Sequence, residues 1–141
     1  MLENITLCKL KKVVLILINK VKINIWDRNF ELPVEYDCYS DEKVTSAQLN
    51  ALKEFIIDTH IINKAKINVE NYCKKALTLD KDNKQKENIF TYIIPHYIYV
   101  KREDNPRIAI MCKYKYDMEH GLAVVFSQNG KIEVGLQDII L

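Results

Sequence analysis

Glycine is scarce in this sequence, with three residues among 141, at positions 121, 130 and 135. A phosphate-binding loop needs several glycines close together so that the backbone can approach the anion, and the shortage nearly excludes a P-loop or a dinucleotide-binding loop. The sequence also lacks the Gly-x-Ser-x-Gly pattern of serine hydrolases and the His-Glu-x-x-His pattern of zinc proteases. The sequence therefore contains no familiar catalytic motif that would indicate an enzyme.

Closely spaced cysteines are lacking too, because those at positions 8, 38, 73 and 112 form no Cys-x-x-Cys pair. Their wide spacing fits none of the common zinc patterns and predicts free thiols in a reducing cytoplasm. The apolar run at residues 13–18 has six residues and is too short to span a membrane. It predicts a buried strand, and the alternative is that residues 1–21 form a peripheral extension of a single domain, 1–141.

A strong excess of charge of either sign is also absent, since the net charge is +2. A dedicated nucleic-acid binder normally has a strongly basic surface, so we expect no direct nucleic-acid partner and no membrane partner. The charges are nevertheless uneven, because residues 27–58 contain eight acidic side chains and three basic ones. This segment could steer the chain toward a basic partner, or its acids could simply cover solvated faces of strands and a helix. The acids are Asp27, Glu31, Glu35, Asp37, Asp41, Glu42, Glu54 and Asp58.

Residues 22–37 have the alternating pattern of a β-hairpin. Apolar residues alternate up to Trp26, turn-forming residues follow at 27–29, and a second alternating run extends from Phe30 to Asp37. Pro33 falls on the polar face of the second run, which predicts an edge strand.

A helical segment follows the hairpin. Residues 45–48, Thr-Ser-Ala-Gln, match a capping box, in which a hydroxyl and a glutamine three positions later satisfy the first amides of a helix. Apolar residues then recur near helical spacing as far as residue 77, as one long helix or as two helices broken near 63–68. Residues 80–88 are polar and aperiodic, which predicts a solvated loop.

The last third of the sequence returns to strand patterns. Runs rich in β-branched and aromatic residues occur at 93–100, 108–116, 122–126 and 131–134. Turn residues separate them at 104–106 and at 127–130, where Asn-Gly favours a tight hairpin. The sequence therefore predicts an α+β fold, in which an antiparallel sheet, made of the N-terminal hairpin and a C-terminal meander, packs against one or two helices.

Asp117, Glu119 and His120 form the closest grouping of carboxylates and imidazole. In a tight turn before Gly121 these side chains could converge and bind a metal ion or act as acid and base. The alternative is a structural turn, in which Asp117 accepts backbone N–H bonds and His120 donates to a carbonyl.

Residues 116–141 resemble the C-terminal signature of an uncharacterised family of small bacterial domains. That signature runs aromatic-Asp-x-Glu-His-Gly-Leu, then a strand, an Asn-Gly-like turn and Val-Gly-x-Gln-Asp. The matching residues are Tyr116, Asp117, Glu119, His120, Gly121, Leu122, Val134, Gly135, Gln137 and Asp138. The helix start at 45–52 resembles the same family, so the resemblance covers about residues 22–141, with Tyr116 in place of a frequent tryptophan. The family has no established catalytic residue, so none is assigned.

In size and cytoplasmic character, domains of this type resemble immunity proteins that neutralise toxins delivered between bacteria, as in contact-dependent growth inhibition. We therefore expect a non-enzymatic, cytoplasmic protein-binding module without a cofactor, as a monomer or homodimer, whose partner is a cognate toxin domain. Nucleic-acid-cutting toxins are usually basic, which favours an acidic binding face. The candidate partner-binding residues are Glu31, Glu35, Asp37, Asp41 and Glu42.

Two alternatives stay open. The first is a small metal-dependent hydrolase that uses Asp117, Glu119 and His120. The second is a homo-oligomeric structural protein, in which an edge strand at residues 30–37 pairs between subunits.

Overall fold

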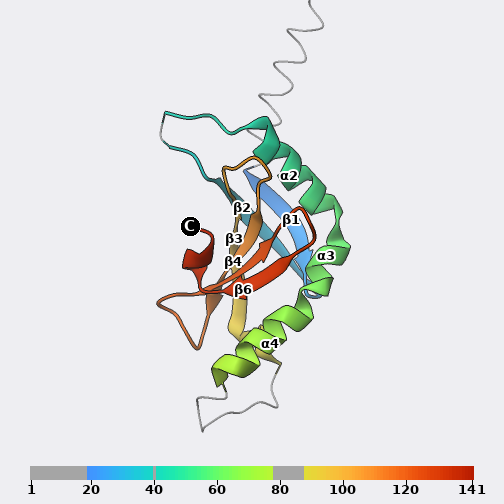
Figure 1. The fold of residues 1–141 in the computed structure, drawn as a ribbon. Helices are drawn as coiled ribbons and strands as arrows, with labels where there is room; N and C mark the ends of the chain where they lie inside the picture. Colours follow the sequence, from blue (N-terminus) through green and yellow to red (C-terminus); the bar gives the residue numbers. More distant parts are fainter. Residues whose placement is uncertain (1–18, 40, 78–87) are drawn as a thin grey trace, which may run out of the picture.

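A computed structural model describes residues 19–39, 41–77 and 88–141 of the chain. In these ranges the strands form one six-stranded sheet in sequential order, β1 to β6, and the helices lie along one side of it (Figure 1). This confirms the predicted α+β class. The predicted strand at 13–18, Cys8 and almost all of the predicted loop at 80–88 lie outside the described residues. No helix in the described ranges is long and apolar enough to cross a membrane.

The N-terminal hairpin is confirmed, with β1 (Lys20–Ile25) antiparallel to β2 (Arg28–Tyr36). The turn lies earlier than predicted, because Trp26 and Asp27 occupy it with φ angles of 50° and 69°. Two consecutive positive φ values suit the twist of a two-residue hairpin turn, although a tryptophan seldom adopts one. Its indole N–H donates to the Ile62 carbonyl at 3.0 Å, and this bond ties the turn to the helical layer.

The hairpin joins the rest of the sheet through a parallel pair. Residues Val34–Tyr36 of β2 pair in parallel with Ile98–Val100 of β3 (Ile93–Val100). The sheet is therefore mixed, whereas the sequence predicted an antiparallel sheet. The edge-strand prediction for β2 is therefore wrong, and so is the basis for pairing residues 30–37 between subunits. The Val34 amide donates to Asn19 of the β1 side, which turns the nitrogen of Pro33 toward β3, just before that ladder begins. The missing N–H of Pro33 thus breaks no bond of the β3 ladder.

Among the described residues, the helical layer consists of three segments. They are α2 (Ser46–Ile57), α3 (Thr59–Lys64) and α4 (Lys66–Leu77). The capping box is confirmed, with the Thr45 side chain accepting from the Gln48 amide and the Gln48 side chain accepting from the Thr45 amide. The break at Ala65 falls in the predicted interval, whereas the break at Asp58 was not predicted. Asp58 leaves helical geometry (φ −87°, ψ 77°), and its carboxylate accepts from the Ile61 amide to start α3.

The C-terminal meander is confirmed. After the short helix η1 (Ile89–Tyr92) and β3, the chain forms β4 (Ile108–Tyr114), β5 (Leu122–Phe126), β6 (Ile132–Gly135) and the short helix η2 (Gln137–Ile139). The hairpin turn at 127–130 is confirmed too, since Gly130 has a φ of 87° and its amide donates to Ser127.

Both faces of the central strands are buried. One face packs against the helices, and there alternate residues of all six strands join the main core. On the opposite face, Tyr99, Ala109, Met111, Ala123, Val125 and Ile140 form a smaller apolar cluster. The C-terminal segment, which contributes Ile140, lies on the side of the sheet away from the helices (Figure 1). We call this second side the outer face of the sheet. Among residues 138–141, only Ile140 is buried.

Candidate protein-binding surface

Glu31 and Glu35 project from β2 on the outer face, away from the helices. Both side chains are exposed, and neither has an ion-pair partner among the described residues. Lys22 of β1 lies opposite Glu31 in the hairpin register, and Lys20 lies opposite Pro33. Because paired residues of neighbouring strands share a face, the β2 carboxylates stand beside a row of lysines and do not form a purely acidic surface.

Two tyrosines of β3 border Glu35. Glu35 is paired with Tyr99 across the parallel ladder. Burial, together with the nearby charges of Asp37 and Glu35, raises the pKa of Tyr99 to about 12. Burial and the Glu35 charge also raise the pKa of Tyr97. Both phenols therefore remain neutral hydrogen-bonding groups at any physiological pH.

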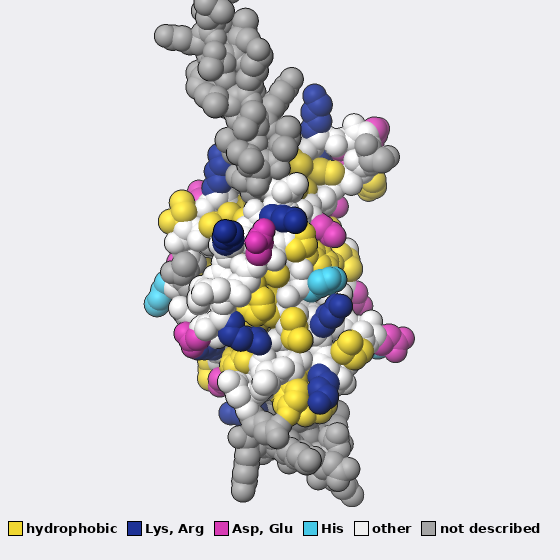
Figure 2. Space-filling view, turned by 180° about the vertical axis from the view of Figure 1, so that it is seen from behind, with side chains coloured by type: hydrophobic (Ala, Val, Ile, Leu, Met, Phe, Trp, Pro, Cys, Tyr) yellow, Lys and Arg dark blue, Asp and Glu magenta, His cyan; other side chains and the backbone are white. Residues whose placement is uncertain are grey.

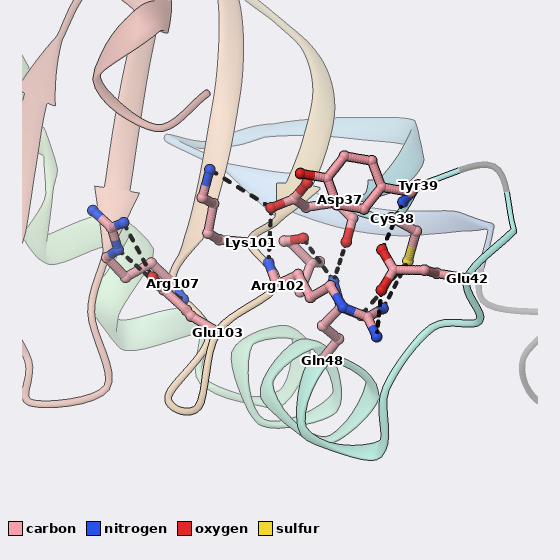
Figure 3. A network of polar contacts seen from close by, with 10 residues as sticks. Asp37, Cys38, Tyr39, Glu42, Gln48, Lys101, Arg102, Glu103 and Arg107 are labelled. Atoms are coloured by element: carbon pink, nitrogen blue, oxygen red, sulfur yellow. Dashed lines mark hydrogen bonds and ion pairs between the residues drawn. The ribbon is translucent and has the colours of Figure 1, made fainter.

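Asp37 and Glu42, in contrast, are occupied by contacts within the chain (Figure 3). The Asp37 carboxylate lies 3.6 Å from Lys101 Nζ and accepts the Arg102 amide at 3.1 Å. The Arg102 guanidinium lies 3.1 Å from the Glu42 carboxylate and donates to the Lys43 carbonyl at 2.9 Å. These contacts fix the segment after β2 against the end of β3.

Gln48 lies at the centre of this network and is fully buried. Its Nε2 donates to the carbonyls of Asp37 at 3.0 Å and Val100 at 3.2 Å, and its Oε1 accepts the Thr45 amide at 2.9 Å. One side chain thus connects the end of β2, the end of β3 and the start of α2 (Figure 3).

The five predicted partner-binding residues therefore do not form one continuous acidic face. Glu31 and Glu35 are free on the sheet, Asp37 and Glu42 belong to the network around Arg102, and Asp41 is exposed in the segment between β2 and α2. Figure 2 shows that acidic, basic and hydrophobic side chains are interspersed on the described part of the side behind Figure 1.

Sequence reasoning missed Arg102, although a signal was present. The chain has three arginines among 21 basic residues, and each of them makes directed contacts. Arg28 donates to the carbonyls of Phe90 and Ile93, and Arg107 makes a two-pronged contact with Glu103. In a lysine-rich chain, arginine marks the places where a planar, forked donor is needed.

Asp117, Glu119 and His120 lie in the turn between β4 and β5. The Asp117 carboxylate accepts the His120 amide at 3.1 Å and lies 3.0 Å from His120 Nδ1, while the side chain of Glu119 points to solvent. The Asp117 contact raises the pKa of His120, and hydrogen bonds from His120 lower the pKa of Asp117. Asp117 accepts a backbone N–H, as the structural-turn interpretation expects, whereas the His120 ring contacts the Asp117 carboxylate instead of the expected carbonyl. In the part of the chain that the structure describes, no group of three or more histidine, cysteine and acidic side chains could hold a metal ion.

Comparison with known proteins places the chain in a family. No curated protein and no solved structure matches it. A family match covers residues 9–141, which is most of the sequence and starts earlier than the resemblance seen near residue 22. The chain therefore belongs to the family described as a domain of unknown function, DUF6985.

Proposed function

We propose that this chain is a non-enzymatic protein-binding module, an immunity protein that neutralises a cognate bacterial toxin in the cytoplasm. One observation carries the proposal: Glu31 and Glu35 are exposed carboxylates on the outer face of β2 without an ion-pair partner among the described residues, and Glu35 lies next to the tyrosines of β3. A strand that is hydrogen-bonded into a sheet holds its side chains at fixed spacing, which favours a specific complex.

The chemistry of this surface fits a basic protein partner. Carboxylates attract lysine and arginine side chains, and tyrosine is enriched at protein interfaces because it combines apolar area with a hydroxyl group. The lysines of β1 beside Glu31 would repel a partner that docks in the wrong register, so they contribute to specificity.

The network around Arg102 determines which residues should be tested. Reversing the charge of Asp37 would break its contacts with Lys101 and Arg102 and disturb the fold. The informative variant is therefore Glu31→Lys combined with Glu35→Lys. The matched control is Glu70→Lys combined with Glu119→Lys, which makes the same change in net charge on α4 and in the β4–β5 turn.

The first experiment is a pull-down with the tagged full chain from lysate of its own bacterium, followed by mass spectrometry. We expect one stoichiometric partner, a toxin whose lethality the chain suppresses on co-expression. Calorimetry with the purified toxin should then show binding at least about tenfold weaker for the Glu31/Glu35 variant than for the control. A toxin bound equally well by both variants would contradict the β2 surface, and failure to protect cells would contradict the immunity function.

A further inference from the structure

A groove lies between the α2–α3 break and two turns of the meander. Its volume is about 250 Å³, which suits one or two side chains. The apolar part of its wall includes Phe55, Phe126, Pro106 and Ile61. The rings of Phe55 and Phe126 pack with their centroids 5.0 Å apart and belong to the buried core, so the groove meets small exposed parts of two fixed rings.

The polar part of the groove is acidic on its helical side. Glu54 and Asp58 line that side, one turn of helix apart, and Ser127 and Gln128 line the opposite side. No lysine or arginine is among the residues that line the groove. The carboxylates therefore have no internal cation there, unlike Asp37 and Glu42 in the network around Arg102.

Local bonds hold both walls in place. The Asp58 amide donates to the Glu54 carbonyl at 3.1 Å, and the Asp58 carboxylate is oriented by accepting the Ile61 amide at 3.3 Å. Across the groove, Gln128 Nε2 donates to the Pro106 carbonyl at 3.5 Å, which connects the β5–β6 turn to the segment before β4. The groove is thus formed by the fold itself.

We propose that this groove binds a lysine or arginine side chain of the partner protein. The aliphatic stem of such a side chain would lie on Phe55 and Phe126, and its charged end would reach the carboxylates of Glu54 and Asp58. The inference rests on the proposed function, because it takes the occupant to be part of a bound protein, and it adds a second contact surface to that of β2.

The test is an NMR titration of the isotopically labelled full chain with N-acetyl-arginine amide. The control probe is N-acetyl-citrulline amide, which has the same shape without the charge. We expect the arginine probe to shift the amide signals of Glu54, Asp58, Ser127 and Gln128, with a dissociation constant on the order of 1–10 mM. Equal shifts from both probes, or no shifts at these amides, would overturn the inference.

A variant confirms which groups respond. Glu54→Gln combined with Asp58→Asn removes both charges, and the asparagine preserves the cap of α3 because it is as good an N-cap as aspartate. We expect binding of the arginine probe to weaken about fivefold in this variant and to stay unchanged in Glu70→Gln, a charge removal on α4. Unweakened binding in the groove variant would overturn the inference.

The outcomes separate this inference from the immunity function. A toxin bound through β2, together with no shifts in the groove, would refute the groove and leave the function standing. Charge-dependent shifts in the groove of a chain that protects no cell would support recognition of basic side chains and contradict the immunity function.

Discussion

Replacing Gln48 by leucine should destabilise the fold, because the hydrogen bonds of this buried side chain connect three segments of the chain. Leucine has a similar volume and helix propensity, so the main loss is that of hydrogen bonds. The Val100 carbonyl keeps the Asp37 amide as a donor at 2.9 Å, whereas the Asp37 carbonyl and the Thr45 amide lose their bonds to Gln48. Each unsatisfied group costs about 1–2 kcal/mol, so we expect the free energy of unfolding to fall by about 2–4 kcal/mol.

The assay is urea denaturation followed by tryptophan fluorescence. Trp26 is the only tryptophan, and it is buried against the helical layer, so its emission reports loss of the core. The control is Gln128→Leu, the same substitution at an exposed site with one long bond, for which we expect a loss below about 0.5 kcal/mol. A loss below about 1 kcal/mol for the Gln48 variant would refute the assigned role, because the stability of the fold would then not depend on the hydrogen bonds that Gln48 makes.

Two further predictions concern the turn between β4 and β5. Gly121→Ala should destabilise the fold by about 2 kcal/mol or more, because φ is 64° and the added Cβ would lie 2.9 Å from the Cys112 carbonyl. Gly130→Ala, at φ 87° with nothing within 4 Å, should cost only about 1 kcal/mol, and equal losses by thermal denaturation would contradict the steric argument. NMR titration should find the pKa of His120 raised, and Asp117→Asn should return it toward its ordinary value. The pair of Asp117 and His120 contributes to stability at pH values below the ordinary histidine pKa, and this contribution is lost as pH rises through the raised pKa of His120. At the acidic end, the contribution is also lost as pH falls through the lowered pKa of Asp117. An unchanged pKa of His120 in Asp117→Asn would contradict the coupling.

The elements that sequence predicted well depend on residues a few positions apart. The capping box involves positions 45 and 48, and the tight turn depends on Asn129 and Gly130. Strand alternation in the hairpin likewise reflects one buried and one exposed face. In each case the residues that stabilise the element belong to the same short sequence pattern, so the pattern alone is enough to predict the element.

The features that sequence missed depend on distant partners. The parallel pairing of β2 with β3 begins directly after Pro33, and nothing near Pro33 in the chain indicates this neighbour. Asp37 and Glu42 looked available because their cationic partners lie at positions 101 and 102. Glu54 and Asp58 were counted in the acidic segment, but the aromatic wall that makes them part of a groove comes partly from β5. Which acids are free is decided by tertiary contacts, which periodicity does not encode.

The short parallel ladder between β2 and β3 has a consequence for how the chain folds. The hairpin and the meander each form from neighbouring segments, whereas this ladder joins positions 64 residues apart and the Asp37–Arg102 contact joins positions 65 residues apart. Closing so long a loop is entropically costly, and it precedes any gain from the few bonds that it makes possible. The junction is therefore expected to be the slow step of folding. The junction also couples the two halves of the sheet. Whether the chain unfolds as one cooperative unit therefore depends on the few hydrogen bonds of this ladder and on the helices that pack across it.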